Sequence, residues 1–104
     1  MTECGIPDDK DDRRADWIRR YAYAMHRAME EGVDVRGFHY WSLLDNFEWA
    51  EGWEPRFGLF GVDYETMERT LRPGAQPFVD LVRKTRGAGA AAPAAPGGDA
   101  PGSA

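Results

Sequence analysis

Apolar residues recur at three- and four-residue steps between Trp17 and Met29, a spacing that predicts one amphipathic helix. The acid-rich run "DDKDDRR" comes just before this stretch and offers capping carboxylates, so we expect the helix to begin near Asp12. Gly32 follows the last apolar position and is typical of a left-handed C-terminal cap. The apolar stripe contains Trp17, Ile18, Tyr21, Ala22, Met25, Ala28 and Met29. The pattern therefore predicts a helix that buries one face against the rest of the chain.

The next segment, "VDVRGFHYWSLL", is apolar and aromatic without strong alternation, which predicts a parallel strand covered on both faces. Near the amino end, "TECG" followed by "IPDD" is typical of an earlier strand that runs into a loop. Residues 56–70, "RFGLFGVDYETMERT", predict an irregular hairpin or an extended segment. Residues 74–86 predict a short closing helix with Phe78, Leu81 and Val82 facing inward.

This order of elements predicts an α/β fold that is incomplete by itself. A parallel strand needs neighbours on both edges, and at most two such strands are available here. We therefore expect residues 1–86 to be the end of a larger α/β structure. Residues 87–104 contain only Gly, Ala, Pro, Ser and one Asp, and we expect them to form a disordered tail.

Composition narrows the classes of partner. The net charge of −5 argues against nucleic-acid binding, and we interpret the arginines of "RRADWIRR" as a solvated helix face. A single cysteine, Cys4, excludes an internal disulfide and favours a cytoplasmic location. No apolar run approaches the roughly 20 residues that span a bilayer, and the first residues do not resemble a signal peptide, so no membrane partner is expected.

Aromatic and acidic residues are concentrated in "HYWSLLDNFEWAEGW". One face of a pyranose ring packs well on an indole, while its rim of hydroxyls needs directed hydrogen bonds. Glu48 beside Trp49 offers a charged acceptor together with an indole N–H donor. Glu3 follows the first predicted strand, and in α/β barrels the loops after the strands line one mouth. These residues predict a site for a small sugar or a glycoside.

A longer resemblance supports this hypothesis. The run "WSLLDNFEWAEGWEPRFGLFGVDYETMERT" resembles the C-terminal signature of the family 1 glycoside hydrolases, the β-glucosidase family. "TECG" is similar to that family's Thr-Glu-Asn-Gly motif, and the helix and strand between the two motifs fit as well. The resemblance covers about residues 2–83. It implies the C-terminal part of a (β/α)8 TIM barrel, namely its last strand–helix–strand portion and closing helix.

The resemblance also implies a role for individual residues. Glu3 matches the catalytic nucleophile of a retaining enzyme, which forms a covalent glycosyl-enzyme. Trp41 matches the platform beneath the sugar, and Glu48 and Trp49 match the pair that binds its hydroxyls. Phe57 matches an aromatic residue beside the same pocket. The intact "EW", without a phosphate-binding Ser/Lys pattern, implies unphosphorylated β-glycosides as substrates.

Two departures from the family pattern shape the functional expectation. Cys4 stands where the family has asparagine, and no Asn-Glu-Pro motif supplies the acid/base glutamate. We therefore expect these 104 residues alone to have negligible hydrolase activity and to need the N-terminal portion of the barrel. Two other classes remain open: a non-catalytic sugar-binding module that uses Trp41, Glu48 and Trp49, and a truncated gene product without function. Glu3 and Glu48 could themselves be a catalytic pair, but the family assigns Glu48 to binding.

The remaining polar and aromatic residues are interpreted as structural. Asp45 and Asn46 are expected to fix a loop through hydrogen bonds, and Trp53 to lie in the core or at the rim of a pocket. His39 is expected to pack within the strand. No metal-ligand spacing or phosphate loop occurs, so neither a cofactor nor a metal is expected. The other residues interpreted as structural are His26, on the helix surface, with Asp63, Tyr64 and Arg69.

Overall fold

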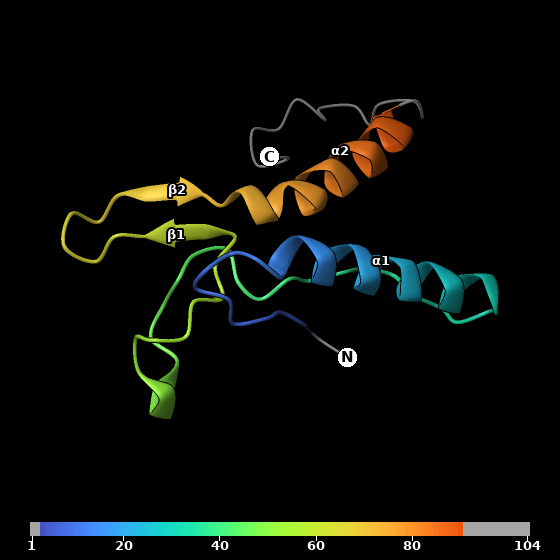
Figure 1. The fold of residues 1–104 in the computed structure, drawn as a ribbon. Coiled ribbons are helices and arrows are strands. Elements are labelled where there is room, and N and C mark those ends of the chain that lie inside the picture. Colours follow the sequence, from blue (N-terminus) through green and yellow to red (C-terminus); the bar gives the residue numbers. More distant parts are fainter. Residues whose placement is uncertain (1–2, 91–104) are drawn as a thin grey trace.

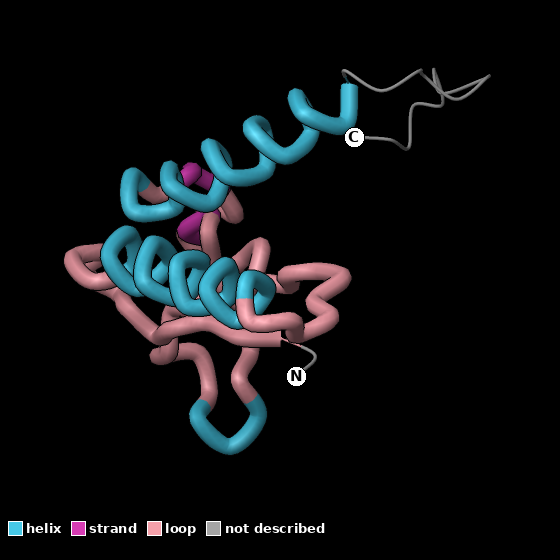
Figure 2. Tube along the Cα trace, turned by 90° about the vertical axis from the view of Figure 1, so that its right-hand side faces the viewer, coloured by secondary structure: helices cyan, strands magenta, loops and turns pink. Residues whose placement is uncertain are grey.

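The computed structural model describes residues 3–90 of the chain. Two helices pack against each other, and a two-stranded hairpin leads into the second of them (Figure 1). A loop that carries a short helical turn projects away from both helices (Figure 2). In chain order the elements are α1 (Arg14–Glu30), η1 (Trp49–Glu51), β1 (Phe60–Val62), β2 (Arg69–Leu71), η2 (Pro73–Ala75) and α2 (Gln76–Ala90), where η marks a 3₁₀ turn.

Helix α1 forms where the apolar pattern predicts it. The N–H groups of Arg13 and Arg14 both donate to Asp8 Oδ2 at 2.8 Å, so an acid of the "DDKDDRR" run caps the helix. Burial would raise the pKa of Asp8, but these two N–H groups and the Arg14 guanidinium hold that pKa below its ordinary value. At the other end Gly32 has a φ of 96°, and its N–H donates to the Met29 carbonyl at 3.0 Å. The predicted acidic cap at the start of α1 and the predicted glycine at its C-terminal end are both confirmed.

The apolar core is small and lies where α1, the hairpin and η2 meet. Its buried cluster consists of Ile18, Leu59 and Ala75. Phe78 of α2 packs against this cluster, and Leu81 and Val82 are half-buried, which confirms the inward face predicted for the closing helix. The apolar stripe is less covered at the C-terminal end of α1, where Met29 is 46% exposed. Much of the interior must therefore be held by something other than apolar packing.

The hairpin predicted from residues 56–70 is present. Strands β1 and β2 pair antiparallel, with Phe60 opposite Leu71 and Val62 opposite Arg69. At the turn, Asp63 Oδ1 accepts the N–H group of Glu65 at 2.9 Å, as a turn-forming aspartate does. Asp63 is thus structural, as predicted.

The parallel strand predicted from residues 33–44 does not form a continuous ladder among residues 3–90. The segment pairs through two isolated parallel bridges, Cys4 with Tyr40 and Leu44 with Phe60. A strand gains its ladder from neighbours along both edges, and the described chain offers only these short contacts. The pairing directions agree with the prediction, whereas its extent was overestimated.

The same segment is covered on one face instead of two. Phe38 packs edge-on against Tyr21 of α1, with 5.9 Å between the ring centroids. Val33 is 55% exposed and His39 is exposed, so the predicted packing of His39 within a buried strand is wrong for the described chain. His26 lies on the exposed surface of α1, as predicted.

A second correction concerns the arginines of "RRADWIRR". Arg13, Arg19 and Arg20 are exposed, as a solvated face requires, but Arg14 is fully buried at 0% exposure. Its guanidinium pairs with the carboxylate of Asp11, and a buried charge is tolerated when it is paired and hydrogen-bonded. The simple helix-surface interpretation was therefore wrong at this one position.

The last helix passes the boundary drawn between residues 86 and 87. Helix α2 continues to Ala90, and the rest of the expected tail, residues 91–104, lies outside the described residues. Within the described chain, neither helix has the length and apolar character that crossing a membrane requires.

Candidate functional site

The two predicted strand ends lie side by side. The Cys4 N–H donates to the His39 carbonyl at 3.1 Å, and the Trp41 N–H donates to the Cys4 carbonyl at 2.7 Å. Gly5 permits this approach, because a Cβ at that position would overlap the Trp41 carbonyl oxygen. Glu3 and Trp41 are therefore carried by adjacent backbone segments, although they are 38 positions apart in the sequence.

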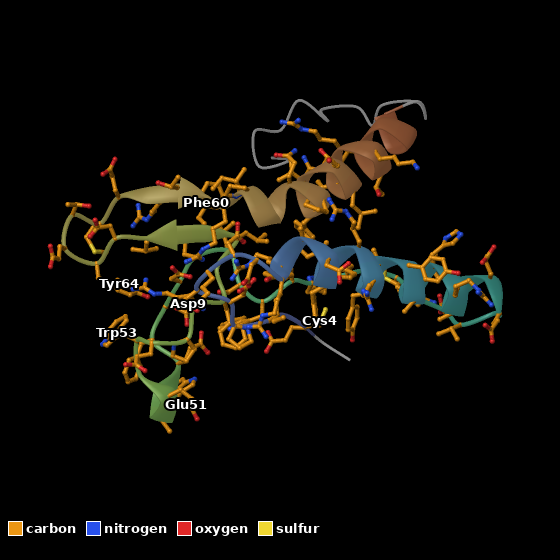
Figure 3. All side chains as sticks on the ribbon, viewed as in Figure 1. Cys4, Asp9, Glu51, Trp53, Phe60 and Tyr64 are labelled. Atoms are coloured by element: carbon orange, nitrogen blue, oxygen red, sulfur yellow. The ribbon has the colours of Figure 1, made fainter. Side chains whose placement is uncertain are left out.

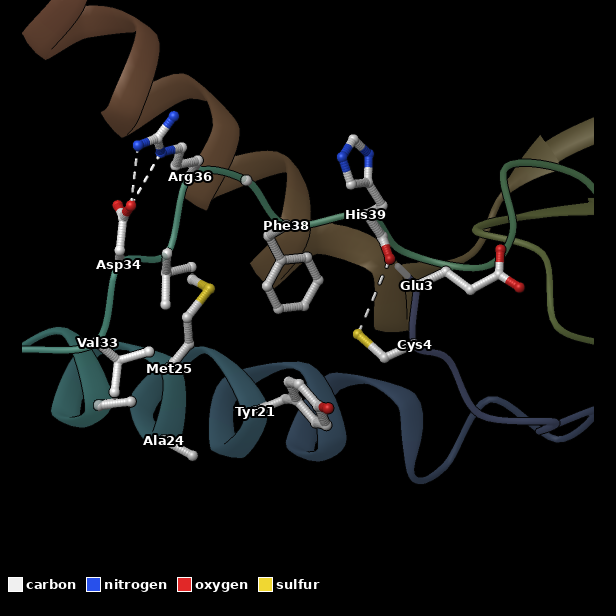
Figure 4. A pocket seen from close by; sticks show the side chains of 13 residues that line it. Glu3, Cys4, Tyr21, Ala24, Met25, Val33, Asp34, Arg36, Phe38 and His39 are labelled. Atoms are coloured by element: carbon white, nitrogen blue, oxygen red, sulfur yellow. Dashed lines mark hydrogen bonds and ion pairs between the residues drawn. The ribbon is translucent and has the colours of Figure 1, made fainter. Parts of the chain in front are cut away.

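The Glu3 side chain is exposed and reaches the edge of a groove between α1 and residues 33–39. Figure 4 shows its carboxylate pointing away from the rings of Tyr21 and Phe38, which line that groove. Trp41 and Glu48 do not line the groove. What links Glu3 to them is the backbone pairing at Cys4, and no direct contact among these described side chains joins Glu3 to Trp41 or Glu48.

Trp41 and Glu48 are in contact. The Trp41 indole Nε1–H donates to Glu48 Oε2 at 3.3 Å, and the Trp41 ring is 38% exposed. The peptide bond between Trp41 and Ser42 is cis. The Ser42 N–H donates to the Phe57 carbonyl at 3.3 Å, which places half-buried Phe57 directly beside this strand end. Three of the predicted sugar-site residues therefore lie together.

Trp49 differs from the other predicted site residues. Its ring is 84% exposed, and its backbone is in the left-handed region with a φ of 53°. This conformation costs a residue other than glycine on the order of 1 kcal/mol, so the surrounding turn must hold it. The turn is closed by the Glu48 N–H, which donates to the Gly52 carbonyl at 2.8 Å. Trp49 follows Glu48 directly in the chain, and the structure displays its ring to solvent.

A second group of rings joins the loop that carries η1 to the hairpin turn, with Phe47 and Trp53 on the loop and Tyr64 at the turn. Trp53 stands between Phe47 and Tyr64, with ring centroids 5.1 and 5.0 Å away (Figure 3 labels Trp53 and Tyr64). Trp53 is 55% exposed and lines a pocket with both neighbours, so it lies at a rim, one of the two predicted places. The Arg56 guanidinium stands 4.5 Å over the Tyr64 ring. Burial raises the pKa of the Tyr64 hydroxyl.

Asp45 and Asn46 fix the loop between Trp41 and Glu48, as predicted. The buried Asp45 carboxylate accepts backbone N–H groups and two guanidiniums. Burial would raise its pKa, but hydrogen bonds from Arg72 keep that pKa below the ordinary value. Asn46 Nδ2 donates to Ser42 Oγ at 3.1 Å and thereby ties the loop to its own beginning.

The residue that the sequence interpretation missed is Arg14, in the first turn of α1, which contacts Tyr40 next to Trp41. Its Nε donates to the Tyr40 hydroxyl at 3.2 Å, and its Nη2 donates to the carbonyls of Asp8 at 3.0 Å and Arg56 at 2.8 Å. It therefore ties the first turn of α1 to the loop before the hairpin. The only available signal was the pair of aspartates three and six positions earlier, Asp11 and Asp8, since its other partners are distant in the sequence.

Cys4, at the position where the resemblance implies asparagine, does not supply an anionic group. Burial raises the pKa of its thiol, and Sγ lies 3.9 Å from the His39 carbonyl (Figure 4). Among the described residues, no group of three or more His, Cys, Asp or Glu side chains could hold a metal ion.

Comparison with known proteins identifies the class. The family model of glycosyl hydrolase family 1 matches residues 2–87, and the chain belongs to this family. It is thus a member of a family of glycosidases, as the resemblance in the sequence implied.

Its relatives carry more specific names. The chain is 47% identical over 83 residues to a β-galactosidase of Sulfolobus acidocaldarius, a match covering 80% of this chain and 17% of that protein. It is 55% identical over 68 residues to a bifunctional β-D-glucosidase/β-D-fucosidase of Bifidobacterium breve, covering 65% of this chain and 15% of that one. A solved hyperthermophilic β-glucosidase from Pyrococcus furiosus matches with a TM-score of 0.77 and 45% identity, over 81% of this chain and 18% of the other. The chain therefore spans less than a fifth of the length of each relative.

Proposed function

We propose that this chain supplies the nucleophile and part of the sugar subsite of a retaining β-glycosidase built on a (β/α)8 barrel. The observation that carries the proposal is the hydrogen bond from the Trp41 indole to Glu48, which joins a ring platform to a charged acceptor. The adjacent backbone pairing at Cys4 supports placing Glu3 on the same side of the fold. Family membership and the names of the relatives support a β-glycoside as substrate.

The proposed reaction has two steps. The Glu3 carboxylate attacks the anomeric carbon while the glycosidic C–O bond breaks and the leaving oxygen takes a proton from a general acid outside this chain. Water then attacks the same carbon, the ester bond to Glu3 breaks, and the deprotonated acid takes the proton of that water. Two inversions give net retention at the anomeric centre. Glu3 is exposed, so it is accessible to a substrate.

The proposed sugar subsite rests on the shape and charge of the Trp41–Glu48 pair. The half-exposed indole offers an apolar face to the C–H side of a pyranose ring. Glu48 Oε2 accepts from the indole, and a sugar hydroxyl can donate to Oε1, the other carboxylate oxygen. Exposed Trp49 extends the platform. The carboxylate also disfavours a phosphorylated sugar through like-charge repulsion, which supports unphosphorylated glycosides.

A chimera tests this proposal with the missing barrel portion supplied. The matched 83-residue segment of the Sulfolobus acidocaldarius β-galactosidase is replaced by the corresponding residues of this chain. We expect hydrolysis of an aryl β-glycoside with retained configuration and a loss of roughly 10³-fold or more in kcat for Glu3→Gln. Glu65→Gln, a change to an exposed acid at the hairpin turn, should leave the rate unchanged.

The chimera can also refute the proposal. Equal rates for the parent chimera and its Glu3→Gln variant would exclude Glu3 as the nucleophile. The 104-residue chain alone should hydrolyse the same substrate roughly 10²- to 10⁴-fold more slowly than the chimera, because no general acid protonates the leaving group. Rapid, Glu3-dependent turnover by the chain alone would contradict this expectation.

A second candidate function is sugar binding without hydrolysis. The observation that favours it is the exposure of two tryptophans beside Glu48, with Trp41 at 38% and Trp49 at 84%. Titration of the chain with cellobiose, followed by tryptophan fluorescence, should show saturable binding that Glu48→Ala abolishes. A response that is the same in the variant would exclude a subsite built on Glu48.

A further inference from the structure

The loop between Trp41 and Glu48 is folded around one carboxylate. The Asp45 side chain is 0% exposed and accepts the Gly58 N–H at 2.9 Å and the Val62 N–H at 3.1 Å. These donors belong to the segment that leads into the hairpin and to β1, so a single side chain joins the loop to both. A buried carboxylate that accepts two backbone N–H groups is strongly held in one orientation.

Two guanidiniums complete the surroundings of this carboxylate. Arg72 binds it with two hydrogen bonds, Nη1 to Oδ1 at 2.8 Å and Nη2 to Oδ2 at 2.9 Å, and Arg56 Nη1 reaches Oδ2 at 3.2 Å. Each arginine also donates to a backbone carbonyl, Arg72 to Gly58 at 2.7 Å and Arg56 to Val62 at 2.9 Å. Asp45 is therefore the centre of a cage whose members come from the loop, the hairpin and the chain just after it.

Asp45, the centre of the cage, lies in the sequence between Trp41 and Glu48, so it can fix the position of one relative to the other. Asp45 lies four positions after Trp41 and three before Glu48. At 3.3 Å the indole–carboxylate hydrogen bond is already at the long end of its range, so a small shift of the loop would break it. Trp41 is held from one side by Cys4, whereas the loop that carries Glu48 is held to the hairpin through Asp45.

We propose that Asp45, with Arg56 and Arg72, is the positioning residue that sets the Trp41–Glu48 geometry for sugar binding. This inference rests on the proposed function, since it assigns the pair to a sugar. Asp45 itself has its carboxylate oxygens occupied by the cage and is buried, so it acts through Glu48 and does not touch the ligand. A carboxylate on a flexible side chain contributes to recognition only where its backbone is fixed within a fraction of an ångström.

The test compares Asp45→Asn with Asp63→Asn in the full chain labelled with ¹⁵N. Both changes replace an aspartate that accepts backbone N–H groups, but Asp63 lies at the exposed hairpin turn and does not reach the loop. The Trp41 indole N–H signal is followed by NMR, and Glu48→Ala defines its position when the contact is absent. Asp45→Asn should move the signal toward that position and weaken cellobiose binding about tenfold or more, whereas Asp63→Asn should change neither.

Loss of the Asp45 charge leaves Arg72, whose side chain is only 13% exposed, without its carboxylate partner, so a second variant, Asp45→Asn/Arg72→Gln, removes both charges. If both variants lose the far-ultraviolet circular dichroism of the fold, Asp45 is a folding residue only and the inference is overturned. An unmoved indole signal with unchanged cellobiose affinity also overturns it. If the wild-type chain shows no sugar binding while the indole signal moves as expected, the positioning stands and the proposed function alone fails.

Discussion

The interior around Arg14 and Asp45 and the surface around Trp49 and Trp53 reverse the usual distribution of side chains. Arg14 and the Asp45 carboxylate are fully shielded from solvent, while the Trp49 and Trp53 rings are 84% and 55% exposed. In most domains charged groups lie outside and large rings lie inside. The reversal indicates that the two regions have different tasks.

The buried charges hold the backbone, whereas the rings of Trp49 and Trp53 leave much of their surface open to solvent. Arg14 and Asp45 each join segments that are distant in the sequence, and every one of these contacts is a directed hydrogen bond. The indoles of Trp49 and Trp53 are not among the rings that pack on the small apolar core of Ile18, Leu59 and Ala75. The comparison predicts that changes in the first region will reduce stability, whereas changes in the second will reduce ligand affinity.

The largest effect is expected from Arg14→Met. The change leaves the Asp11 carboxylate and the Asp8 and Arg56 carbonyls without their buried partner, which should cost about 3–5 kcal/mol of unfolding free energy. Urea unfolding followed by circular dichroism measures the loss. Arg20→Met is the matched control, because Arg20 forms an exposed pair with Asp16 on the same helix and should cost about 0.5 kcal/mol or less. Equal costs would show that the buried network adds nothing.

The second-largest loss of unfolding free energy is expected at acid pH, where Asp8 and Asp45 become protonated. Burial opposes ionisation of Asp8 and Asp45, but backbone N–H groups and the Arg14 and Arg72 guanidiniums lower both pKa values below 3.8. A carboxyl whose pKa is lower in the folded state adds stability above its unfolded pKa, and that stability disappears as the pH falls through the folded pKa. The unfolding free energy should therefore be constant near neutral pH and fall below about pH 4. A flat profile down to pH 2 would contradict the paired state of these acids.

A smaller loss is expected where the strand ends meet. In Gly5→Ala the new methyl group would overlap the Trp41 carbonyl, so the segments must separate at a cost of about 1–3 kcal/mol. Gly87→Ala, in open space near the end of α2, should instead stabilise the chain by about 0.5–1 kcal/mol. Thermal unfolding of both variants measures whether each change in stability is a loss or a gain. A Gly5→Ala variant as stable as the parent chain would contradict the steric requirement for glycine at this position.

A change at exposed Trp49 should reduce ligand affinity without reducing stability. Trp49→Gly relieves a left-handed backbone and should leave stability unchanged or raise it by up to about 1 kcal/mol. Loss of the ring should weaken cellobiose binding about two- to tenfold in fluorescence or NMR titrations. Met67→Gly offers a control, since Met67 also has a positive φ, 63°, and lies in the hairpin turn. It should gain stability without loss of affinity, and a drop equal to that of Trp49→Gly would argue against a specific stacking role.

The elements that local patterns specify were predicted well. The apolar period of α1 and its capping residues depend on neighbours within a few positions, and the turn chemistry at Asp63 is equally local. The hairpin and the closing helix followed from the same signals. Trp41, Glu48 and Phe57 could be named together because a long motif carries them in one short stretch of sequence.

What the sequence could not supply are pairings between distant segments. The strand over residues 33–44 was overestimated because its ladder depends on neighbours that the apolar pattern does not contain. Arg14 was assigned to the surface because a helical arginine is normally solvated, and two of the contacts that complete its buried surroundings, with Tyr40 and with the Arg56 carbonyl, lie 26 and 42 positions away. The left-handed backbone of Trp49 likewise depends on the closed turn around it and has no signal in the residue type.

The hydrogen bond from the Gly74 N–H to Asp11 Oδ2 spans 63 positions of the chain. During synthesis, the amino-terminal turn of α1 emerges from the ribosome well before the partner that completes its surroundings. Until then the Asp11 and Arg14 charges remain hydrated, and burying them early would be unfavourable. Helix α1 can therefore reach its final environment only after residue 74 has been translated.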